Sequence, residues 1–176
     1  FSPMCIDLYD ESKLNTYYDV LKEAIDNRAS NGTNWVYMSS GFDSSGILSF
    51  LVDIFGKSKV RAIIARFKYS NKSGVINNFE IERAKKITEY FSLPLEIVDI
   101  DYTSKTYLEF WEKIRPTLKS KHIYNLLAYN FYFLASKINE FGSDNDAIFT
   151  GEMSDGAHNF GFAQFASILE HQDLNF

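Results

Sequence analysis

The stretch VYMSSGFDSSGIL, residues 36–48, joins an apolar run to a segment rich in serine and glycine that holds a single aspartate, Asp43. The short run WVYM, 35–38, is apolar and β-prone, so it predicts a buried strand. The segment SGILSFLVDIF, 45–55, is mostly apolar and predicts a helix, whose N-terminal cap we expect among Asp43, Ser44 and Ser45. A strand that leads through a polar loop into a helix is therefore the first unit of the predicted fold.

The same alternation of strand and helix continues along the chain. Apolar side chains at helical spacing predict a first helix over 14–28, followed by turn residues at 31–34. The remaining predicted elements are strands at 60–67, 95–100 and 147–151, and helices at 77–91, 104–114 and 122–141. Strands that alternate with helices indicate right-handed crossovers. We therefore expect an α/β fold, a doubly wound parallel sheet with helices on both faces.

Two of these helices carry more detailed expectations. In the helix 77–91, we expect Asn77 or Asn78 to cap the N-terminus. Its buried face is predicted to contain Phe79, Ala84, Ile87 and Phe91. In the helix 104–114, Pro116 is expected to end the element, because proline has no N–H to donate within a helix.

Composition and charge limit the classes of protein to consider. The chain has 176 residues, of which 45% are hydrophobic and 16% aromatic, so we expect one folded domain with a substantial core. A net charge of -5 argues against a general nucleic-acid or anionic-membrane binder, and no apolar run is long enough to span a bilayer. The single cysteine, Cys5, excludes an internal disulfide framework and favours a reducing compartment, so we expect a cytoplasmic location. We also expect the chain, which runs from Phe1 to Phe176, to be a piece of a longer protein.

Positive charge is concentrated in one part of the sequence. No acidic residue lies between Asp53 and Glu80. The same interval holds the cations Lys57, Lys59, Arg61, Arg66, Lys68 and Lys72. Two interpretations stay open, a solvated edge and a patch that faces an anion.

Two polar loops, 39–46 and 151–159, each follow a predicted strand. Ligands of parallel α/β sheets bind beyond the carboxyl ends of the strands, at the point where the strand order reverses. If the strands 35–38 and 147–151 are neighbours across that point, both loops face one crevice. This adjacency is a hypothesis.

The first loop has the chemistry of an anion site. Hydroxyl groups and a permissive backbone stand at the start of a helix, where N–H groups and the helix dipole favour phosphate. The residues that supply them are Ser39, Ser40, Gly41, Ser44 and Ser45. Asp43 would repel a bare phosphate, so its presence indicates a bridging Mg²⁺. Glu152 and Asp155 in the second loop are further carboxylates, and two carboxylates that clamp Mg²⁺ on a polyphosphate form a coherent site.

Simpler interpretations of both loops remain open. A serine- and glycine-rich segment after a strand is typical of a turn and helix cap, and Glu152 and Asp155 could be solvated loop acids. The sequence contains neither a Walker loop nor a Rossmann fingerprint. GFDSS, 41–45, resembles the nucleophile elbow of some α/β-hydrolases with Asp43 as nucleophile, for which His158 or His171 would have to serve as the histidine.

SSGFDSS, 39–45, resembles the S-G-G-x-D-S pyrophosphate loop of the N-type ATP pyrophosphatases. Within that superfamily, TGEMSDG, 150–156, is similar to the second motif, S-G-E-G-x-D-E, of the synthetase domain of class B asparagine synthetases and their β-lactam-synthetase relatives. The resemblance runs from about residue 14 to 162 and includes NNFEIERAKKITEYFSLPLEIVDID, 77–101. It implies an adenine nucleotide α-hydrolase-like fold. Residues 1–176 would then be a partial synthetase domain, without the later part of the family domain or a glutaminase domain.

The resemblance also implies roles for individual residues. Pyrophosphate would be held by Ser39, Gly41, Asp43, Ser44 and Ser45, with Ser40 in the same loop. Asp43 and Asp155 would hold Mg²⁺, and Glu152 would orient the substrate or the nucleotide. The adenosine pocket would be lined by Met38, Thr150, Gly151 and the backbone near Ala65 and Arg66.

The sequence departs from the family pattern at three positions of these motifs. Ser40 stands in place of the first glycine of the pair, Met153 replaces a glycine, and Gly156 stands where the family has a glutamate. The catalytic lysine region that follows in the family is not part of this chain, and Cys5 is not a chain-terminal nucleophile.

The expected function is therefore that of an ATP- and Mg²⁺-dependent ligase. It would adenylate a small-molecule carboxylate, release pyrophosphate and pass the acyl group to ammonia or an amine, with a glutaminase domain or subunit outside this chain as a possible partner. A nucleotide-binding module without turnover is the first alternative, favoured by Ser40, Met153 and Gly156. The hydrolase with Asp43 as nucleophile is the second.

Overall fold

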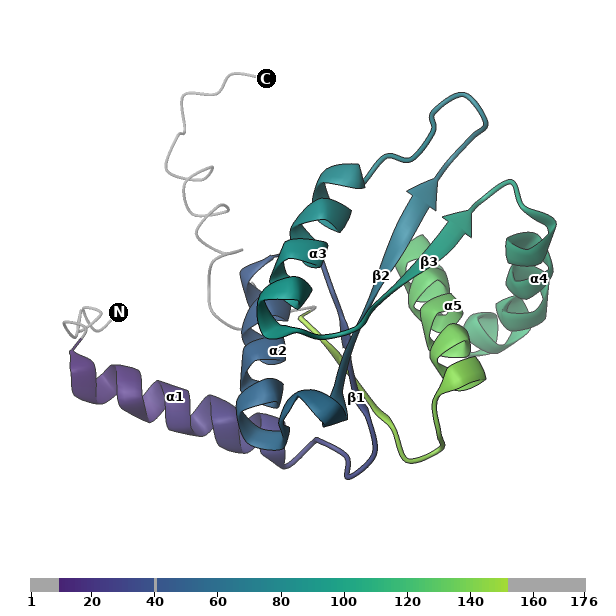
Figure 1. Cartoon of the computed structure of the whole chain (residues 1–176). Coiled ribbons are helices and arrows are strands. Elements are labelled where there is room, and N and C mark those ends of the chain that lie inside the picture. The colour runs from purple at the N-terminus through teal and green to yellow at the C-terminus, as the bar shows by residue number, and fades with distance from the viewer. Residues whose placement is uncertain (1–9, 40, 152–176) are drawn as a thin grey trace, which may run out of the picture.

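The computed structural model describes residues 10–39 and 41–151. Five α-helices, four strands and one short 3-10 helix follow one another in these residues (Figure 1). In chain order they are α1 (Glu11–Asp26), β1 (Asn34–Tyr37), α2 (Phe42–Phe55), η1 (Lys57–Lys59), β2 (Val60–Lys68), α3 (Asn78–Phe91), β3 (Leu95–Asp101), α4 (Lys105–Ser120), α5 (Leu126–Phe141) and β4 (Ala147–Thr150). The alternation of strands and helices predicted from the sequence is confirmed.

The four strands form one parallel sheet in the order β3-β2-β1-β4. From β1, the chain moves outward through β2 to β3, and it then returns to place β4 on the other side of β1. The strand order therefore reverses between β1 and β4, where Tyr37 is paired with Thr150. The hypothesis that these two strands are neighbours is confirmed, and the sheet has its switch point at their carboxyl ends.

Helices cover both faces of the sheet (Figure 1). On β2, Ala62 and Ile64 are buried in a cluster with side chains of α2 and α3. Ile63 and Ala65 alternate with them and are buried in a second cluster with side chains of α4 and α5. Because successive strand residues point to opposite faces, a strand buried on both sides is apolar in its centre, as the AIIA run of VRAIIARF is, while Arg61 and Arg66 on either side of that run are exposed. The predicted doubly wound α/β architecture is confirmed.

The prediction that Pro116 ends the fourth helix is wrong. α4 continues through Pro116 to Ser120, and Leu118, two residues beyond the proline, is fully buried. A proline inside a helix costs about 3 kcal/mol, and burial of a leucine side chain contributes about 1.5–3 kcal/mol in the opposite direction. Burial of Leu118 in the last turn thus offsets much of the cost of the proline.

Two further details of the predicted helices are also wrong. α5 begins at Leu126 rather than at 122, because His122 has a left-handed backbone (φ 56°) in the turn before the helix. In α3 the predicted burial of Ala84 is confirmed, and Ile87 and Phe91 pack against the core while partly buried. The side chain of Phe79, however, is 73% exposed, and Ile81 and Thr88 are buried instead. The ends of the other predicted elements differ from the observed ones by three residues or fewer.

Candidate functional site

A pocket of about 310 Å³ lies at the carboxyl ends of β1, β2 and β4. The first turns of α2 and α3 and the N-terminal half of α5 complete its wall. Its polar lining residues are Ser39, Asp43, Asn77, Glu80 and Thr150. The pocket therefore lies at the edge of the sheet where the strand order reverses, the usual ligand position of such folds.

The predicted nucleotide-binding residues fall into three groups. Those that line the pocket are Met38, Ser39, Asp43, Ala65, Thr150 and Gly151. Those that the structure describes but that do not line it are Gly41, Ser44, Ser45 and Arg66. Ser40, Glu152 and Asp155 lie outside the described residues. The structure thus brings parts of both predicted motifs to one cavity, at strand ends that are far apart in the sequence.

Two serine hydroxyls hold the loop before α2 together. Ser44 is 1% exposed, and its Oγ lies 3.2 Å from Ser39 Oγ and donates to the carbonyl of Gly41 over 3.3 Å. Ser45 Oγ donates to the same carbonyl over 2.7 Å. The expectation that Asp43, Ser44 or Ser45 caps the helix is wrong, because α2 begins at Phe42 and its N-cap is Gly41.

The N-terminus of α2 has no side-chain cap. Its N-cap residue is a glycine, whereas α1, α4 and α5 are capped by side chains, those of Asp10, Ser104 and Asn125. The first N–H groups of a helix have no partner within the helix, and the helix dipole adds a partial positive charge at the same end. Such a terminus, next to a pocket, is suited to an anion such as phosphate.

Gly151 brings the end of β4 against the first turn of α2. A Cβ atom added at Gly151 would lie 2.9 Å from Asp43 Cβ and 3.0 Å from Ser44 N. Any residue other than glycine would therefore push β4 and α2 apart. This contact is where the two predicted loops begin to meet, since the second loop starts at Gly151.

Asn77 and Glu80, from the start of α3, are pocket residues that the sequence analysis did not predict as part of the site. Asn77 stands at the N-cap position, but its side chain makes no cap hydrogen bond. It binds the backbone of β2 instead, with Nδ2 donating to Ala65 O over 2.8 Å and Oδ1 accepting from Phe67 N over 2.9 Å. In the sequence, an asparagine before a predicted helix indicates an N-cap, and nothing in the sequence pointed to a role for Asn77 in the pocket.

The apolar side of the pocket is built from aromatic and aliphatic side chains. Tyr37 and Phe131 stack with their ring centroids 5.3 Å apart and an interplanar angle of 15°, and Tyr37 Oη donates to Phe131 O over 3.1 Å. Burial raises the pKa of Tyr37, which keeps its hydroxyl neutral. Leu127 and Leu134 continue this wall along α5. A flat apolar surface opposite a polar one suits a ligand with a planar ring and a charged end.

The described residues fit a magnesium ion held together with phosphate. Asp43 and Glu80 are the two carboxylates among the pocket residues, and Ser39 adds a hydroxyl oxygen. Mg²⁺ is commonly bound by one or two carboxylates plus substrate phosphate oxygens, and a dedicated protein cage is not needed. Residues 10–39 and 41–151 contain no cluster of three or more acidic, histidine or cysteine side chains suited to a metal. Asp155, the other predicted ligand, lies outside these ranges.

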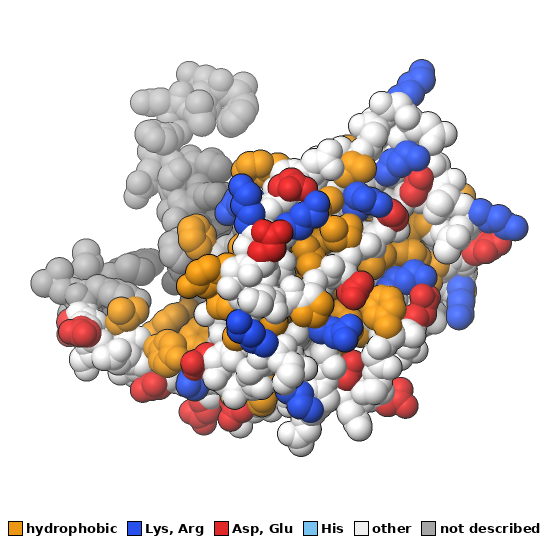
Figure 2. Space-filling model, viewed as in Figure 1, with side chains coloured by type: hydrophobic (Ala, Val, Ile, Leu, Met, Phe, Trp, Pro, Cys, Tyr) orange, Lys and Arg blue, Asp and Glu red, His pale blue; other side chains and the backbone are white. Residues whose placement is uncertain are grey.

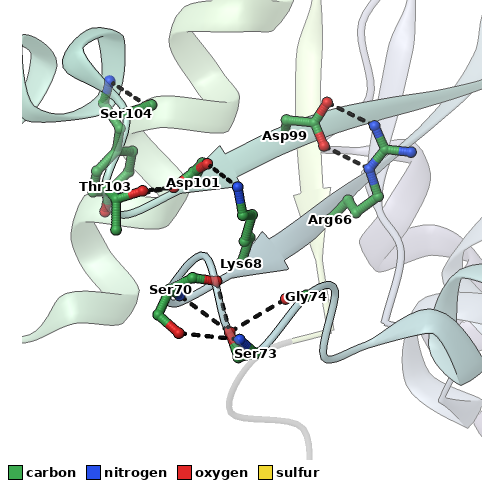
Figure 3. Close-up of polar contacts among 10 residues, drawn as sticks. Arg66, Lys68, Ser70, Ser73, Gly74, Asp99, Asp101, Thr103 and Ser104 are labelled. Atoms are coloured by element: carbon green, nitrogen blue, oxygen red, sulfur yellow. Dashed lines mark hydrogen bonds and ion pairs between the residues drawn. The ribbon is translucent and has the colours of Figure 1, made fainter.

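Arg66 and Lys68 form cross-strand ion pairs with β3 (Figure 3). The Arg66 guanidinium binds Asp99 through Nε at 2.5 Å and through its terminal nitrogen at 2.7 Å. Lys68 Nζ lies 3.0 Å from Asp101 Oδ2. Hydrogen bonds from Thr103 and from Lys68 lower the pKa of Asp101 to about 2.

The geometry of these cations favours a charged edge over an anion-facing patch. Arg61 lies 3.9 Å from Glu96, and Lys59 Nζ donates to Asn31 O over 2.6 Å at the opposite end of β2. Figure 2 shows Lys and Arg side chains interspersed with Asp and Glu on this face of the molecule. The positive charge of the interval is therefore distributed along β2, where acidic neighbours compensate much of it.

Among the described helices, none combines the length and the apolar character needed to cross a membrane.

The sequence matches no family model and no curated protein. The structure is similar to that of a glutamine-dependent NAD+ synthetase from Acinetobacter baumannii in complex with ADP, with a TM-score of 0.50 and 18% identity over 79% of this chain and 25% of that chain. An NH3-dependent NAD synthetase from Campylobacter jejuni in complex with a nitrate ion superposes with a TM-score of 0.44 and 16% identity, over 80% of this chain and 56% of that one. At such identities the similarity concerns the fold alone. The chain spans about a quarter of the first protein and just over half of the second.

Proposed function

We propose that this chain is the nucleotide-binding part of an ATP-dependent amide ligase of the N-type ATP pyrophosphatase superfamily, which forms AMP and pyrophosphate. The observation that carries the proposal is the N-terminus of α2, which has no side-chain cap and has Asp43 in its first turn, lining the pocket. The SSGFDSS motif at this terminus resembles the pyrophosphate loop of that superfamily. The fold is in keeping with the proposal, since the NAD+ synthetase of similar fold was solved with an adenine nucleotide.

The phosphate end of ATP would lie against α2. Backbone N–H groups of its first turn and the Ser39 hydroxyl would donate to phosphate oxygens. Asp43, together with Glu80 or Asp155, would hold Mg²⁺, which supplies positive charge that offsets the charge of the departing pyrophosphate. Ser44 and Ser45 would act mainly by fixing the turn, because their hydroxyls bind Gly41 O.

The adenosine end would occupy the apolar side of the pocket. Met38 and the backbone of Ala65 would form one wall, with Thr150 near the switch point. Tyr37 and Phe131 would form the wall on the α5 side. This division puts the planar base on apolar side chains and the charged end at a helix N-terminus, which is how such groups are generally bound.

The proposed reaction has two steps. An oxygen of the substrate carboxylate attacks the α-phosphorus, the bond to pyrophosphate breaks, and an acyl adenylate forms. The nitrogen of ammonia or of an amine then attacks the acyl carbon, the bond to AMP breaks, and the nitrogen loses a proton as the amide forms. The residues of this chain would bind and orient ATP for the first step. Glu152 would orient the substrate, and the nitrogen would come from solution or from a glutaminase partner.

The experiment that tests this function is ATP–pyrophosphate exchange with a panel of carboxylates. L-aspartate represents the asparagine-synthetase type, and the dinucleotide with a carboxylate in place of the amide of NAD+ represents the synthetase of similar fold. The proposal predicts exchange that depends on one of these carboxylates and is lost in Asp43→Ala. Exchange that is unchanged in Asp43→Ala, or ester hydrolysis without ATP, would exclude it.

A nucleotide-binding module without turnover is the second candidate. Gly156 in place of the family's glutamate, with Ser40 and Met153, favours it. It predicts thermal stabilisation by Mg·ATP with no carboxylate-dependent exchange. The two measurements together distinguish the candidates.

A further inference from the structure

β2 extends beyond the end of its neighbour β1. β1 ends at Tyr37, and among the described residues the last backbone hydrogen bond on that side is Met38 N donating to Ile63 O over 2.8 Å. β2 continues to Lys68. From Ala65 onward, the edge of β2 that faces the switch point therefore has no β1 strand beside it. Unpaired backbone groups of a buried strand are costly, so they require other partners.

The Asn77 side chain supplies these partners. It is 9% exposed, and its amide donates to Ala65 O over 2.8 Å and accepts from Phe67 N over 2.9 Å. A carboxamide carries the same donor and acceptor as a peptide group, so Asn77 takes the place of one residue of the missing strand. Ile76 N adds a third contact, to Phe67 O over 3.1 Å.

The loop after β2 brings Asn77 to this position. Lys68 pairs with Val75 in an antiparallel bridge, so the chain turns back on itself directly after the strand. Ser70 and Ser73 close the turn, with Ser70 N donating to Ser73 Oγ and Ser73 N donating to Ser70 Oγ, each over 3.1 Å (Figure 3). The turn thus places Asn77 beside the edge of β2 that β1 does not cover, and α3 begins at the next residue.

This edge is also a wall of the pocket. Ala65, Phe67 and Asn77 all line it, together with Phe131 from α5. Under the function proposed above, the planar base would lie against this wall, and the phosphates would lie at α2. The conformation of β2 beyond Ile63 then decides the shape of the base subsite, and the conformation of the α2 loop decides the phosphate subsite.

We propose that Asn77 is a positioning residue for the base of the nucleotide, a role that rests on the function proposed above. Its carboxamide keeps β2 extended beyond the end of β1 and so fixes the wall formed by Ala65 and Phe67. It also engages the Ala65 carbonyl, which directs that group toward α3. Loss of the carboxamide should weaken binding of the base and leave binding of the phosphates unchanged.

Asn130 provides a matched control. It is a buried asparagine with a similar exposed fraction, 6%, and it hydrogen-bonds Tyr102 and Tyr107. It lies in α5 and does not line the pocket. Replacement of Asn130 by alanine therefore removes a buried hydrogen-bond network of comparable size elsewhere in the domain.

The experiment measures binding of ATP and of inorganic pyrophosphate, both with Mg²⁺, to the full chain and to Asn77→Ala, Asn77→Asp and Asn130→Ala. We expect Asn77→Ala to weaken ATP binding about tenfold or more, equivalent to about 1.4 kcal/mol, with pyrophosphate binding within about twofold of the unmodified chain. Asn77→Asp keeps an acceptor for Phe67 N but sets a carboxylate oxygen against Ala65 O, so it should weaken ATP binding at least as much as Asn77→Ala does. It also serves as the test variant if the alanine variant does not fold. Asn130→Ala should bind both probes like the unmodified chain.

Three results would overturn the inference and leave the proposed function intact. They are ATP binding by the Asn77 variants within about twofold of the unmodified chain, equal weakening of ATP and pyrophosphate, or an equal loss of ATP binding in Asn130→Ala. Failure of the unmodified chain to bind ATP would instead overturn the proposed function, and this inference with it.

Discussion

Asn77 and Asn125 both occupy the N-cap position of a helix, yet their side chains bind different partners. Asn125 has an extended backbone (φ -102°, ψ 146°) and accepts from Ala128 N over 2.7 Å, so it stabilises its own helix, α5. Asn77 has a different backbone conformation (φ -115°, ψ 33°) and binds two backbone groups of β2. Asparagine at the N-cap position thus stabilises its own helix in α5, whereas before α3 it stabilises the strand that forms the pocket wall.

The difference extends to the other helices. α1, α4 and α5 have side-chain caps, whereas α2 and α3, whose first turns both border the pocket, have none. A missing cap costs a helix about 1 kcal/mol. Among the α-helices that the structure describes, the two without a side-chain cap are the two whose first turns border the pocket, which fits an anion-binding role for the N-terminus of α2.

The largest expected effect on stability comes from the two asparagines themselves. Asn77→Ala leaves a buried carbonyl and a buried N–H of β2 without partners, so it should lower the free energy of unfolding by about 3 kcal/mol. Asn125→Ala removes one exposed cap and should lower it by about 1 kcal/mol. Urea unfolding measures both values. Equal losses would show that Asn77 stabilises no more than an ordinary cap does.

Two glycines of the α2 region should give effects of opposite sign. Gly151→Ala places a Cβ 2.9 Å from Asp43 Cβ and should destabilise the domain by about 1–3 kcal/mol, with weaker ATP binding. Gly46 lies inside α2, and an added Cβ there has nothing within 4 Å, so Gly46→Ala should stabilise by about 0.5–1 kcal/mol. Thermal unfolding with and without Mg·ATP measures both effects. A neutral Gly151→Ala variant would contradict the close approach of β4 to α2.

Asp146 lies at the opposite end of the sheet from the pocket, and its carboxylate should stabilise the domain at neutral pH but not in strong acid. Burial raises its pKa, but hydrogen bonds from Trp35 Nε1, from Thr33 N and from Ser143 outweigh this and lower it from 3.8 to about 2. Because the folded pKa lies below the unfolded one, the stabilisation is complete above pH 4 or so and is lost as the pH falls toward 2.

Asp146→Asn should therefore flatten the decrease of the unfolding free energy between about pH 4 and about pH 2, without a change in ATP affinity at neutral pH. Urea unfolding at a series of pH values measures this. An unchanged acid slope would mean that the hydrogen bonds of Asp146 do not favour its charged form.

The sequence predicted the layers of the fold because the periodicity of apolar residues is local. VRAIIARF and WVYM predicted buried strands correctly, and the polar loops at their carboxyl ends predicted the edge of the sheet at which the pocket lies. The pairing of β1 with β4 could be stated only as a hypothesis, because it depends on how the chain returns after α5.

The errors have a common cause, which is packing between distant segments. Pro116 lies inside α4, whose last turn contains the fully buried Leu118, and burial of that turn is not visible in the local sequence. Phe79 lies at a helical spacing that predicted burial, yet it is exposed. The role of Asn77 arises because β2 extends beyond the end of β1. The sequence of either strand alone does not show this difference in length. The predicted roles of Ser40, Glu152 and Asp155 stay predictions.

The measurement that tests the central claim most directly is calorimetric titration of ATP with Mg²⁺ into the unmodified chain, Asp43→Asn and Asp53→Asn. Asp53 is a matched control, because it lies near the other end of α2 and pairs with Lys22 at 2.8 Å, away from the pocket. We predict saturable binding by the unmodified chain and by Asp53→Asn, and loss of binding in Asp43→Asn. Absence of binding by the unmodified chain, or equal binding by all three proteins, would contradict the assignment of this pocket to ATP.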